Sequence, residues 1–311
     1  MKKNSIVLIL PYFGEWPIWF DAHIKSIEAN PSINWLIPTD CDIPEKYPKN
    51  IQFIKISFEE INLFFNKQLG FDIALNYRKF CDLKPTYGHV FEEYIQKYEF
   101  WGFCDMDIIW GNIRKYITND DLQDFDIISS RHNAISGHFN IFRNNEELKY
   151  LYRSVNDYDK LLSSSKLTRF DENLVTAYIK INSTHFRIKW NQILCNQERG
   201  RDSHQEYYLD KWIWKNGVLI DRHINTEIMY LHFINWKHTL SLSEIGLKDE
   251  VNEFYISYSK IHSKLHTEIE CYTNKFKNLF IGYWITESRR YRLLKIKSII
   301  KRIKNKLRND T

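Results

Sequence analysis

The sequence predicts an α/β protein, and three observations support this class. Short apolar runs alternate along the first half of the chain with segments that carry apolar residues at helical spacing. Such alternation is typical of a sheet whose strands are joined by helices. The 311 residues are 43% hydrophobic and 27% charged, the composition of a folded chain rather than a disordered one. The length fits one large α/β domain or two smaller ones.

Each element is predicted from its own residues. Strands are expected at Ser5–Leu10, Asn34–Thr39, Ile51–Ile56, Glu99–Cys104, Asp126–Ser129, His138–Arg143 and Glu227–Phe233. Helices are expected at Phe58–Leu69, Tyr87–Tyr98, Asn145–Ser154 and Glu172–Lys180. The first helix has the clearest start, because Ser57 can cap it and Glu60 follows three residues later, which is a capping-box pattern. After Ser241 the pattern becomes helical.

Several classes of protein are disfavoured. No apolar run approaches the roughly 18–20 residues that span a bilayer. The apolar stretch Ile6–Leu10 ends at Pro11 and is too short for the core of a signal peptide. The five cysteines form no CxxC pair, so a disulfide framework and a cysteine-based zinc cluster are both disfavoured. We therefore expect a cytoplasmic protein.

The basic charge is concentrated at the end of the chain. Residues 287–311 carry ten basic and two acidic residues, a net +8 against +5 for the whole chain, so the remainder is mildly acidic. This distribution disfavours nucleic acid as a partner. The tail also places apolar residues at helical spacing, namely Leu293, Ile296, Ile300, Ile303 and Leu307. Such a helix fits the surface of an anionic membrane, or it packs its stripe on the body of the protein.

The segment Asp105-Met106-Asp107 is the sharpest candidate for a functional site. It follows an apolar strand, and alternate side chains of an extended segment share a face, so both carboxylates are expected to point one way. Open α/β sheets bind ligands at this edge, and two carboxylates suit Mg²⁺ or Mn²⁺. His232, within the late strand, could supply a third ligand; a histidine among apolar neighbours can also be an ordinary core residue.

Two other segments offer groups for catalysis. Asp171 and Glu172 open an expected helix, where either could be a general base or bind the acceptor, or simply stabilise the helix N-terminus. Ser136-Gly137-His138 forms a loop in which the missing Cβ of Gly137 would let the backbone approach a ligand; a plain turn is the alternative.

A charged segment and a strand end could bind the nucleotide part of a donor. Arg78 and Lys84 could balance a diphosphate, and Asp82 could hold a ribose or sugar hydroxyl; local ion pairs on a surface loop are the alternative. Thr39 and Asp40 end the second strand, where nucleosides are often held, and their assignment rests on position alone.

Four blocks of the sequence resemble a family of proteins from bacterial polysaccharide gene clusters, most of them uncharacterised or assigned as glycosyltransferases. The blocks are Leu10–Pro17, Cys81–Gly88, Phe100–Asp107 and Gly137–Phe139 with Arg143-Asn144, and the resemblance spans about residues 6–236. More broadly, the chain is similar to GT-A glycosyltransferases, which combine a DxD metal motif, a glycine-containing loop, an acidic xED-like motif and a C-terminal histidine ligand. The matching residues are Asp105 and Asp107, Gly137, Asp171-Glu172 (with the two acids in reversed order) and His232.

The resemblance implies a GT-A-like, Rossmann-like mixed sheet flanked by helices. We expect this domain at 1–241, a helical extension at 242–286 and the basic tail at 287–311. The implied activity is transfer of a hexose from a nucleotide-diphosphate sugar, by base rate a UDP-sugar, to a lipid-linked or growing surface glycan such as O-antigen, capsule or lipooligosaccharide. Asp105, Asp107 and His232 would hold Mn²⁺ or Mg²⁺. The residues expected around the donor are Pro11, Tyr12, Thr39, Asp40, Arg78, Asp82, Lys84, Asp105, Gly137 and His138.

The roles of the two acids depend on stereochemistry. An inverting enzyme needs Asp171 or Glu172 as a base, whereas in a retaining enzyme they would position the substrate. The tail would hold the protein on the inner face of the cytoplasmic membrane, where lipid-linked acceptors are found.

Two other functions remain open. A metal-dependent phosphohydrolase or phosphotransferase also places Asp-x-Asp at a strand end, but such enzymes carry it near the N-terminus with Thr or Val where this chain has Ile109. A non-catalytic glycan- or membrane-binding protein would use the carboxylates structurally.

Overall fold

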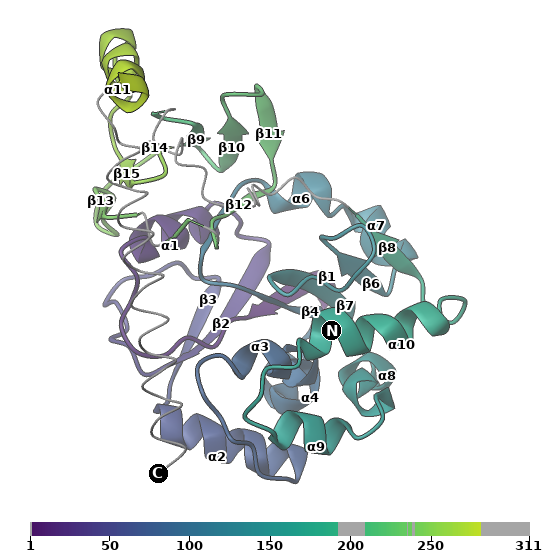
Figure 1. Ribbon diagram of the computed structural model, residues 1–311. Helices are drawn as coiled ribbons and strands as arrows, with labels where there is room; N and C mark the ends of the chain where they lie inside the picture. The colour runs from purple at the N-terminus through teal and green to yellow at the C-terminus, as the bar shows by residue number, and fades with distance from the viewer. Residues whose placement is uncertain (1, 192–208, 235, 238–239, 281–311) are drawn as a thin grey trace.

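The computed structural model describes residues 2–191, 209–234, 236–237 and 240–280, and its largest element is a seven-stranded mixed sheet (Figure 1). The strand order is β3-β2-β1-β4-β7-β6-β8. The four strands from β3 to β4 run parallel, and β7 is antiparallel to both of its neighbours. The strands are β1 Lys2–Ile9, β2 Ile33–Thr39, β3 Ile51–Lys55, β4 Tyr98–Cys104, β6 Ile127–Ser129, β7 Phe139–Arg143 and β8 Ile188–Trp190.

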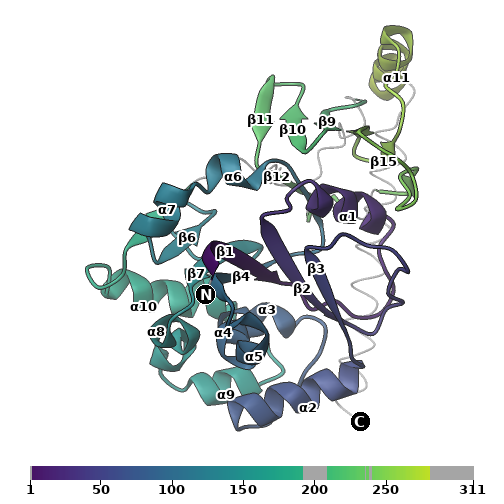
Figure 2. The ribbon, with the colours of Figure 1, turned by 180° about the vertical axis from the view of Figure 1, so that it is seen from behind.

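Helices cover both faces of this sheet, as Figures 1 and 2 show from opposite sides. Successive residues of a strand point to opposite faces, so Val7 and Ile9 join one apolar core while Ile6 and Leu8 join another. The first core is closed by α2 Phe58–Leu69, α3 Phe80–Leu83, α4 Tyr87–Val90, α5 Glu92–Ile95, α8 Glu146–Lys149, α9 Tyr158–Ser163 and α10 Thr176–Ile181. The second core is closed by α1 Phe20–Glu28, α6 Ile113–Tyr116 and α7 Asn119–Asp124. The predicted mixed α/β sheet flanked by helices is therefore confirmed.

Two smaller sheets complete the described part of the chain. A six-stranded sheet has the order β11-β10-β9-β14-β15-β13, and a two-stranded sheet pairs β12 with β5. Their strands are β5 Ile108–Trp110, β9 Trp212–Lys215, β10 Val218–Asp221, β11 Thr226–Ile228, β12 Tyr230–His232, β13 Leu242–Ser243, β14 Glu253–Ile256 and β15 Lys260–His262. The helix α11 Glu268–Phe280 follows. Within the described ranges, no helix combines the length and apolarity that a bilayer crossing requires.

The predicted helix at 58–69 is confirmed to the residue. Ser57 accepts a hydrogen bond from the backbone N–H of Glu60, and the Glu60 carboxylate accepts one from the Ser57 N–H, which is a complete capping box. Gly70 ends the helix in the left-handed conformation at φ 81°. The six strands expected in the first half of the chain are also present, with ends shifted by up to three residues.

Three predicted elements are wrong in detail. The single helix expected at 87–98 is two short helices separated by Phe91, whose buried ring packs edge-on against Phe65 and Tyr87, and residue 98 already belongs to β4. The helix expected at 145–154 is α8 followed by the 3-10 turn Leu151–Ser154. The helix expected at 172–180 begins with the π-helical turn Phe170–Val175 (η3) and continues as α10.

The C-terminal third differs most from expectation. The strand expected at 227–233 is divided at Met229 between β11 and β12, which belong to different sheets. The helical extension expected at 242–286 is wrong for residues 242–262, which contain three strands, and helix begins only at Glu268. Phe254 and Ile256, two residues apart on β14, are buried in one core with Trp212 and Trp214 of β9, so the sheet has the strand period of two. The predicted basic tail at 287–311 lies outside the described residues.

Candidate functional site

The two aspartates lie where the parallel strand β4 ends. Asp105 and Asp107 occupy the bend between β4 and β5, and Met106 between them is buried. The sheet edge at which β1, β2 and β4 end therefore carries both carboxylates, as the sequence predicts.

His232 reaches this edge through the small sheet. β12 pairs antiparallel to β5, and in this register His232 lies opposite Ile108, the residue after Asp107. The Nε2 atom of His232 lies 3.4 Å from Oδ1 of Asp107 and 3.8 Å from Oδ2 of Asp105. The ligand atoms of the three residues all lie within 4.8 Å of one another. The structure brings the predicted triplet together, and its role as a metal site stays a prediction.

The environment of the triplet suits a cation. His232 is 2% exposed, its Nε2 faces the two carboxylates, and its Nδ1 has no hydrogen-bond partner. Two carboxylates and an imidazole that face one another in a largely buried place are a set of groups that a cation could bind. Asp107 is buried, whereas the Asp105 side chain is 25% exposed and gives access from solvent. Two carboxylates suit Mg²⁺ or Mn²⁺, and the imidazole favours Mn²⁺, the softer of the two ions.

Two lysines balance the carboxylates. Lys84 donates to Oδ1 of Asp105 and to the carbonyl oxygen of Gly137. Lys237 Nζ lies 2.8 Å from Oδ2 of Asp107. Burial raises the pKa of the Asp107 carboxyl, but the charges and hydrogen bonds of His232 and Lys237 outweigh it and hold this pKa well below its usual range. Burial alone would lower the pKa of Lys84, but the negative charges around it, of which Asp105 contributes most, together with its hydrogen bond to Asp105, raise this pKa above its usual value.

The acidic pair lies next to the glycine loop. A Cβ added to Gly137 would stand 3.1 Å from Oε1 of Glu172 and 3.4 Å from Oδ2 of Asp171, so a side chain here would press on the carboxylate of Glu172. Asp171 is 3% exposed and its Oδ2 has no hydrogen-bond partner. Burial raises the pKa of Asp171 to about 7, against the opposing charge of Lys84. Glu172 is instead paired with Arg131 at 3.1 Å, a partner that the sequence analysis missed.

His138 lies behind the candidate ligand rather than at the donor site. Its ring stacks on that of His232 with centroids 4.3 Å apart, and its Nε2 lies 2.7 Å from the hydroxyl of Tyr230. Burial first, and then the charges of His232 and Lys84, lower the pKa of His138 well below its usual value, so this ring is neutral. The prediction that His138 binds the donor directly is corrected, because its buried ring packs against His232 and Tyr230 and does not line the cavity beside Asp105.

A cavity of about 460 Å³ opens beside Asp105 and Asp107. Of the predicted donor residues, it is lined by Pro11, Tyr12, Lys84 and Asp105. Tyr12 stacks on Trp16 at a centroid distance of 5.4 Å, and burial raises the pKa of its hydroxyl to about 12. Asp107, predicted as a metal ligand, also lines it. The other lining residues were not predicted from the sequence, namely Leu10, Phe13, Trp19, Tyr77, Phe80, Cys81, Tyr87, Cys104, Met106, Ile234 and Lys237. Their aromatic rings make this wall suitable for a flat or sugar-shaped ligand.

Asp82 is not placed to hold a sugar hydroxyl. It is fully buried, pairs with Lys79 at 3.0 Å, and accepts hydrogen bonds from the backbone N–H groups of Thr168 and Phe170. Its oxygens thus connect α3 to the start of η3 and the residues just before it. The prediction that Asp82 is a donor ligand is wrong, because the chain itself saturates the carboxylate.

Three other predicted donor residues lie away from this cavity wall. Thr39 is fully buried, and its hydroxyl accepts from the N–H of Cys41. Asp40 accepts from the N–H of Gly14 at 2.7 Å, and Arg78 is exposed. None of the three lines the cavity beside Asp105.

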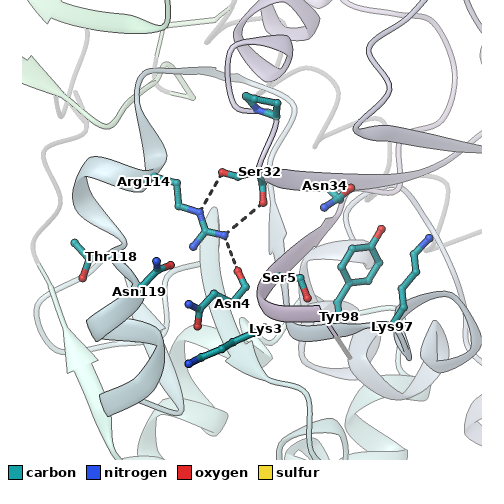
Figure 3. Close-up of a pocket in the computed structure, with 11 residues that line it drawn as sticks. Lys3, Asn4, Ser5, Ser32, Asn34, Lys97, Tyr98, Arg114, Thr118 and Asn119 are labelled. Atoms are coloured by element: carbon teal, nitrogen blue, oxygen red, sulfur yellow. Dashed lines mark hydrogen bonds between the residues drawn. The ribbon is translucent and has the colours of Figure 1, made fainter.

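A second cavity, of about 710 Å³, lies where β1, β2 and β4 begin, at the opposite end of these strands (Figure 3). Lys3, Lys97 and Arg114 line it together with neutral polar side chains. The Arg114 guanidinium donates to the carbonyl oxygens of Asn4, in β1, and Ser32, just before β2, and so connects these two segments. Its lining holds none of the acidic candidates, so the smaller cavity is the candidate site.

The comparisons with known proteins give a family. A family model described as a family of unknown function, DUF6625, matches residues 8–265. The chain belongs to this family. The matched range of DUF6625 includes Asp105, Asp107, Asp171 and His232 and extends through β15, beyond residue 236 where the sequence resemblance ends, while residues 287–311 lie outside it. No curated protein matches the chain.

Two solved structures are similar to this chain. The galactosyltransferase LgtC in complex with donor and acceptor sugar analogues has a TM-score of 0.35 and 11% identity, over 58% of this chain and 72% of that chain. An active-site mutant of LgtC has a TM-score of 0.39 and 11% identity, over 73% of this chain and 87% of that chain. Scores this low carry no conclusion about activity.

Proposed function

We propose that this protein is a metal-dependent glycosyltransferase that moves a hexose from a nucleotide-diphosphate sugar to a hydroxyl of a glycan acceptor. The convergence of Asp105, Asp107 and the buried His232, with the two aspartates lining an aromatic-walled cavity, carries this proposal. Diphosphates bring negative charge that requires a counter-charge, and the cavity provides Lys84 and Lys237 beside the carboxylates.

The triplet would hold Mn²⁺ or Mg²⁺, which supplies orientation and charge neutralisation for a diphosphate. The chain's own residues do the remaining work. Lys237 is 45% exposed at its side chain and bonds Asp107, so it can turn from this carboxylate to a phosphate oxygen. Tyr12, Trp19 and Tyr77 present ring surfaces that can stack on a base or a sugar. Uridine is the base-rate choice of nucleoside.

Asp171 is the group that we propose takes the acceptor proton. Its pKa of about 7 leaves a substantial ionised fraction at neutral pH, and its free Oδ2 can accept a hydrogen. The acceptor oxygen forms a bond to the anomeric carbon, its proton passes to Oδ2 of Asp171, and the bond from that carbon to the phosphate oxygen breaks with its electrons on the leaving nucleotide. Lys84, between the Gly137 carbonyl and Asp105, supplies positive charge near the leaving group.

The test is incubation of the purified chain with UDP-hexoses, Mn²⁺ and a chromatographic readout. Release of UDP, slow without an acceptor and faster with one, supports the proposal. Release of UMP and hexose 1-phosphate would indicate a phosphohydrolase instead, and none of these products, in a protein shown to be folded, would indicate a binding protein. The Asp107→Asn variant separates true turnover from a contaminant, because it should release no UDP.

The acceptor and the location form a second part of this proposal. The basic tail at 287–311 would bind an anionic surface on the cytoplasmic side. This would bring the cavity to a lipid-linked glycan such as an O-antigen, capsule or lipooligosaccharide precursor. Deleting residues 287–311 should weaken sedimentation with vesicles that contain phosphatidylglycerol, with no change for neutral vesicles. Unchanged sedimentation would assign the tail to packing.

A further inference from the structure

A second cluster of metal-ligating side chains lies in the six-stranded sheet. Asp210 stands just before β9, His262 ends β15, and His266 lies two residues before α11. Oδ1 of Asp210 is 2.9 Å from Nε2 of His262 and 2.8 Å from Nδ1 of His266, and all three ligand atoms lie within 4.8 Å of one another. Asp210 and His262 are buried, and none of the three lines the cavity beside Asp105.

The hydrogen bonds of His262 define which of its nitrogens is free. Nδ1 lies 2.8 Å from the carbonyl oxygen of Lys264, which can only accept, so Nδ1 carries the hydrogen. Nε2 is the nitrogen that faces the Asp210 carboxylate, at 2.9 Å from Oδ1, and the hydroxyl of Ser257 lies 3.3 Å from it. The backbone carbonyl thus holds one nitrogen of the ring while the other is directed at the carboxylate, which is the orientation that a shared ligand to a metal ion needs.

We propose that Asp210, His262 and His266 form a binding site for a borderline divalent cation of the zinc class, separate from the site at Asp105. One carboxylate oxygen and two imidazole nitrogens form a donor set that Zn²⁺ favours, and three protein ligands leave a fourth position for water. The His-x3-His spacing falls in the range of known zinc sites. The bond from Nδ1 of His262 to a backbone carbonyl is the outer contact that holds a zinc-binding imidazole in place.

This site uses no cysteine, so the absence of a CxxC pair in the sequence does not bear on it. Its ligands come from the start of β9, the end of β15 and the approach to α11. A bound ion would therefore join three segments that are separate in the sequence, and its role would be to stabilise the six-stranded sheet rather than to act on the donor.

Lys260 competes with the metal. Its Nζ lies 3.1 Å from Nε2 of His266, and an ammonium group can only donate, so in the metal-free state His266 accepts there and donates from Nδ1 to Asp210. Metal binding at Nδ1 moves that proton to Nε2 and requires the Lys260 ammonium to move away. Arg222, at 3.9 Å from Oδ2 of Asp210, adds a second positive charge near the site. Removing the Lys260 charge should therefore tighten metal binding.

The experiment is calorimetric titration of chelator-treated full-length His232→Gln protein with ZnCl₂, so that the first triplet is disabled. We expect one equivalent of zinc to bind, a rise in Tm on binding, and at least a 100-fold weaker affinity after adding His262→Gln. Lys260→Gln in the same background, whose amide oxygen can accept from Nε2, should bind several-fold more tightly.

Loss of all zinc binding in the His232→Gln protein would overturn the proposal and assign the contact to a protonated His262 paired with Asp210. Unchanged zinc affinity in the His262→Gln protein would also overturn it. If this variant does not fold, Co²⁺ added to the His232→Gln protein, in which the second cluster is intact, gives the same decision. A four-coordinate nitrogen–oxygen site produces strong visible absorption, whereas the weak spectrum of six-coordinate Co²⁺ alone would contradict the proposed site.

Discussion

His232 lies 3.4 Å from Asp107 because the pairing of β12 with β5 places the histidine opposite the residue that follows the aspartate. Asp107 also accepts the backbone hydrogen bond of Phe233 through its carbonyl oxygen, at 3.1 Å. Backbone pairing thus holds the two residues next to each other before their side-chain torsions are considered. This is the rigidity that a metal site built from distant segments needs.

The first prediction concerns this pair. His232→Gln and Asp107→Asn should each lower Mn²⁺ affinity by about 100-fold or more and abolish sugar transfer, because each removes one of three ligands. Isothermal titration with MnCl₂ and an assay of UDP release check it. Asp120→Asn, a carboxylate on the exposed first turn of α7, is the matched control and should behave as wild type. Full activity of the Asp107 variant would remove the metal hypothesis.

The second prediction separates Asp82 from the donor site. Asp82→Asn leaves the buried Lys79 without its counter-charge, so it should lower the free energy of unfolding by about 3–5 kcal/mol. The folded fraction should keep the KM of the wild type, because the carboxylate contacts only the chain. Asp157→Asn is the matched control, since it breaks an exposed pair with Lys160 at the same i,i+3 spacing and should cost at most about 1 kcal/mol. A raised KM at unchanged stability in the Asp82 variant would restore the role in sugar binding.

Local patterns predicted the parts of the fold that local physics determines. The capping box at Ser57 and Glu60 and the continuous apolar run of β1 each lie within a few residues, and both were predicted correctly. The position of Asp105 and Asp107 could be predicted for the same reason, because a buried strand leads directly into them. His232 could be named from the sequence as a candidate third ligand, with an ordinary core histidine as the alternative, and the pairing of β12 with β5 explains physically how it reaches the two aspartates.

What the sequence could not show depends on contacts between distant segments. Asp82 and Lys84 belong to the same charged segment, yet the first is saturated by Thr168 and Phe170 and the second reaches Asp105. Their opposite roles follow from which way each side chain turns once α3 is packed. The strands at 242–262 were missed because each spans only two to four residues, which is too short for an alternating pattern to stand out from a helical one.

The third prediction concerns pH. Burial is the main cause that raises the pKa of Asp171 from its ordinary value to about 7 in the folded protein. Between about pH 4 and pH 7, the folded state therefore keeps a proton on Asp171 that the unfolded state has lost. The folded protein should therefore lose stability as the pH rises through this window. Asp171→Asn has no such proton to release. Its free energy of unfolding, measured relative to that of the wild type, should therefore rise by about 2–3 kcal/mol between pH 5 and pH 8.

Urea unfolding of both proteins across this range measures the difference. Curves that stay parallel from pH 5 to pH 8 would show that Asp171 is not protonated in the folded state. Sugar transfer by the wild type should rise over the same window, because the ionised carboxylate is the form that accepts a proton, and the Asn variant should lose this pH dependence along with most of its activity.

The last prediction tests the sheet that positions Asp105. Gly102 lies on β4, and a Cβ there would stand 2.2 Å from the backbone oxygen of Asn140 on the neighbouring strand β7. A backbone oxygen cannot move away by a side-chain rotation. Gly102→Ala should therefore lower the free energy of unfolding by about 3 kcal/mol or more and separate the two strands. Gly70→Ala is the control, because no atom lies within 4 Å of its added Cβ and only its φ of +81° is unfavourable, at about 1–2 kcal/mol. Chemical denaturation ranks the two variants, and equal losses would contradict the close approach of β7 to β4. Because Asp105 follows β4 directly, the Gly102 variant should also lose Mn²⁺ affinity, whereas the Gly70 variant should keep it.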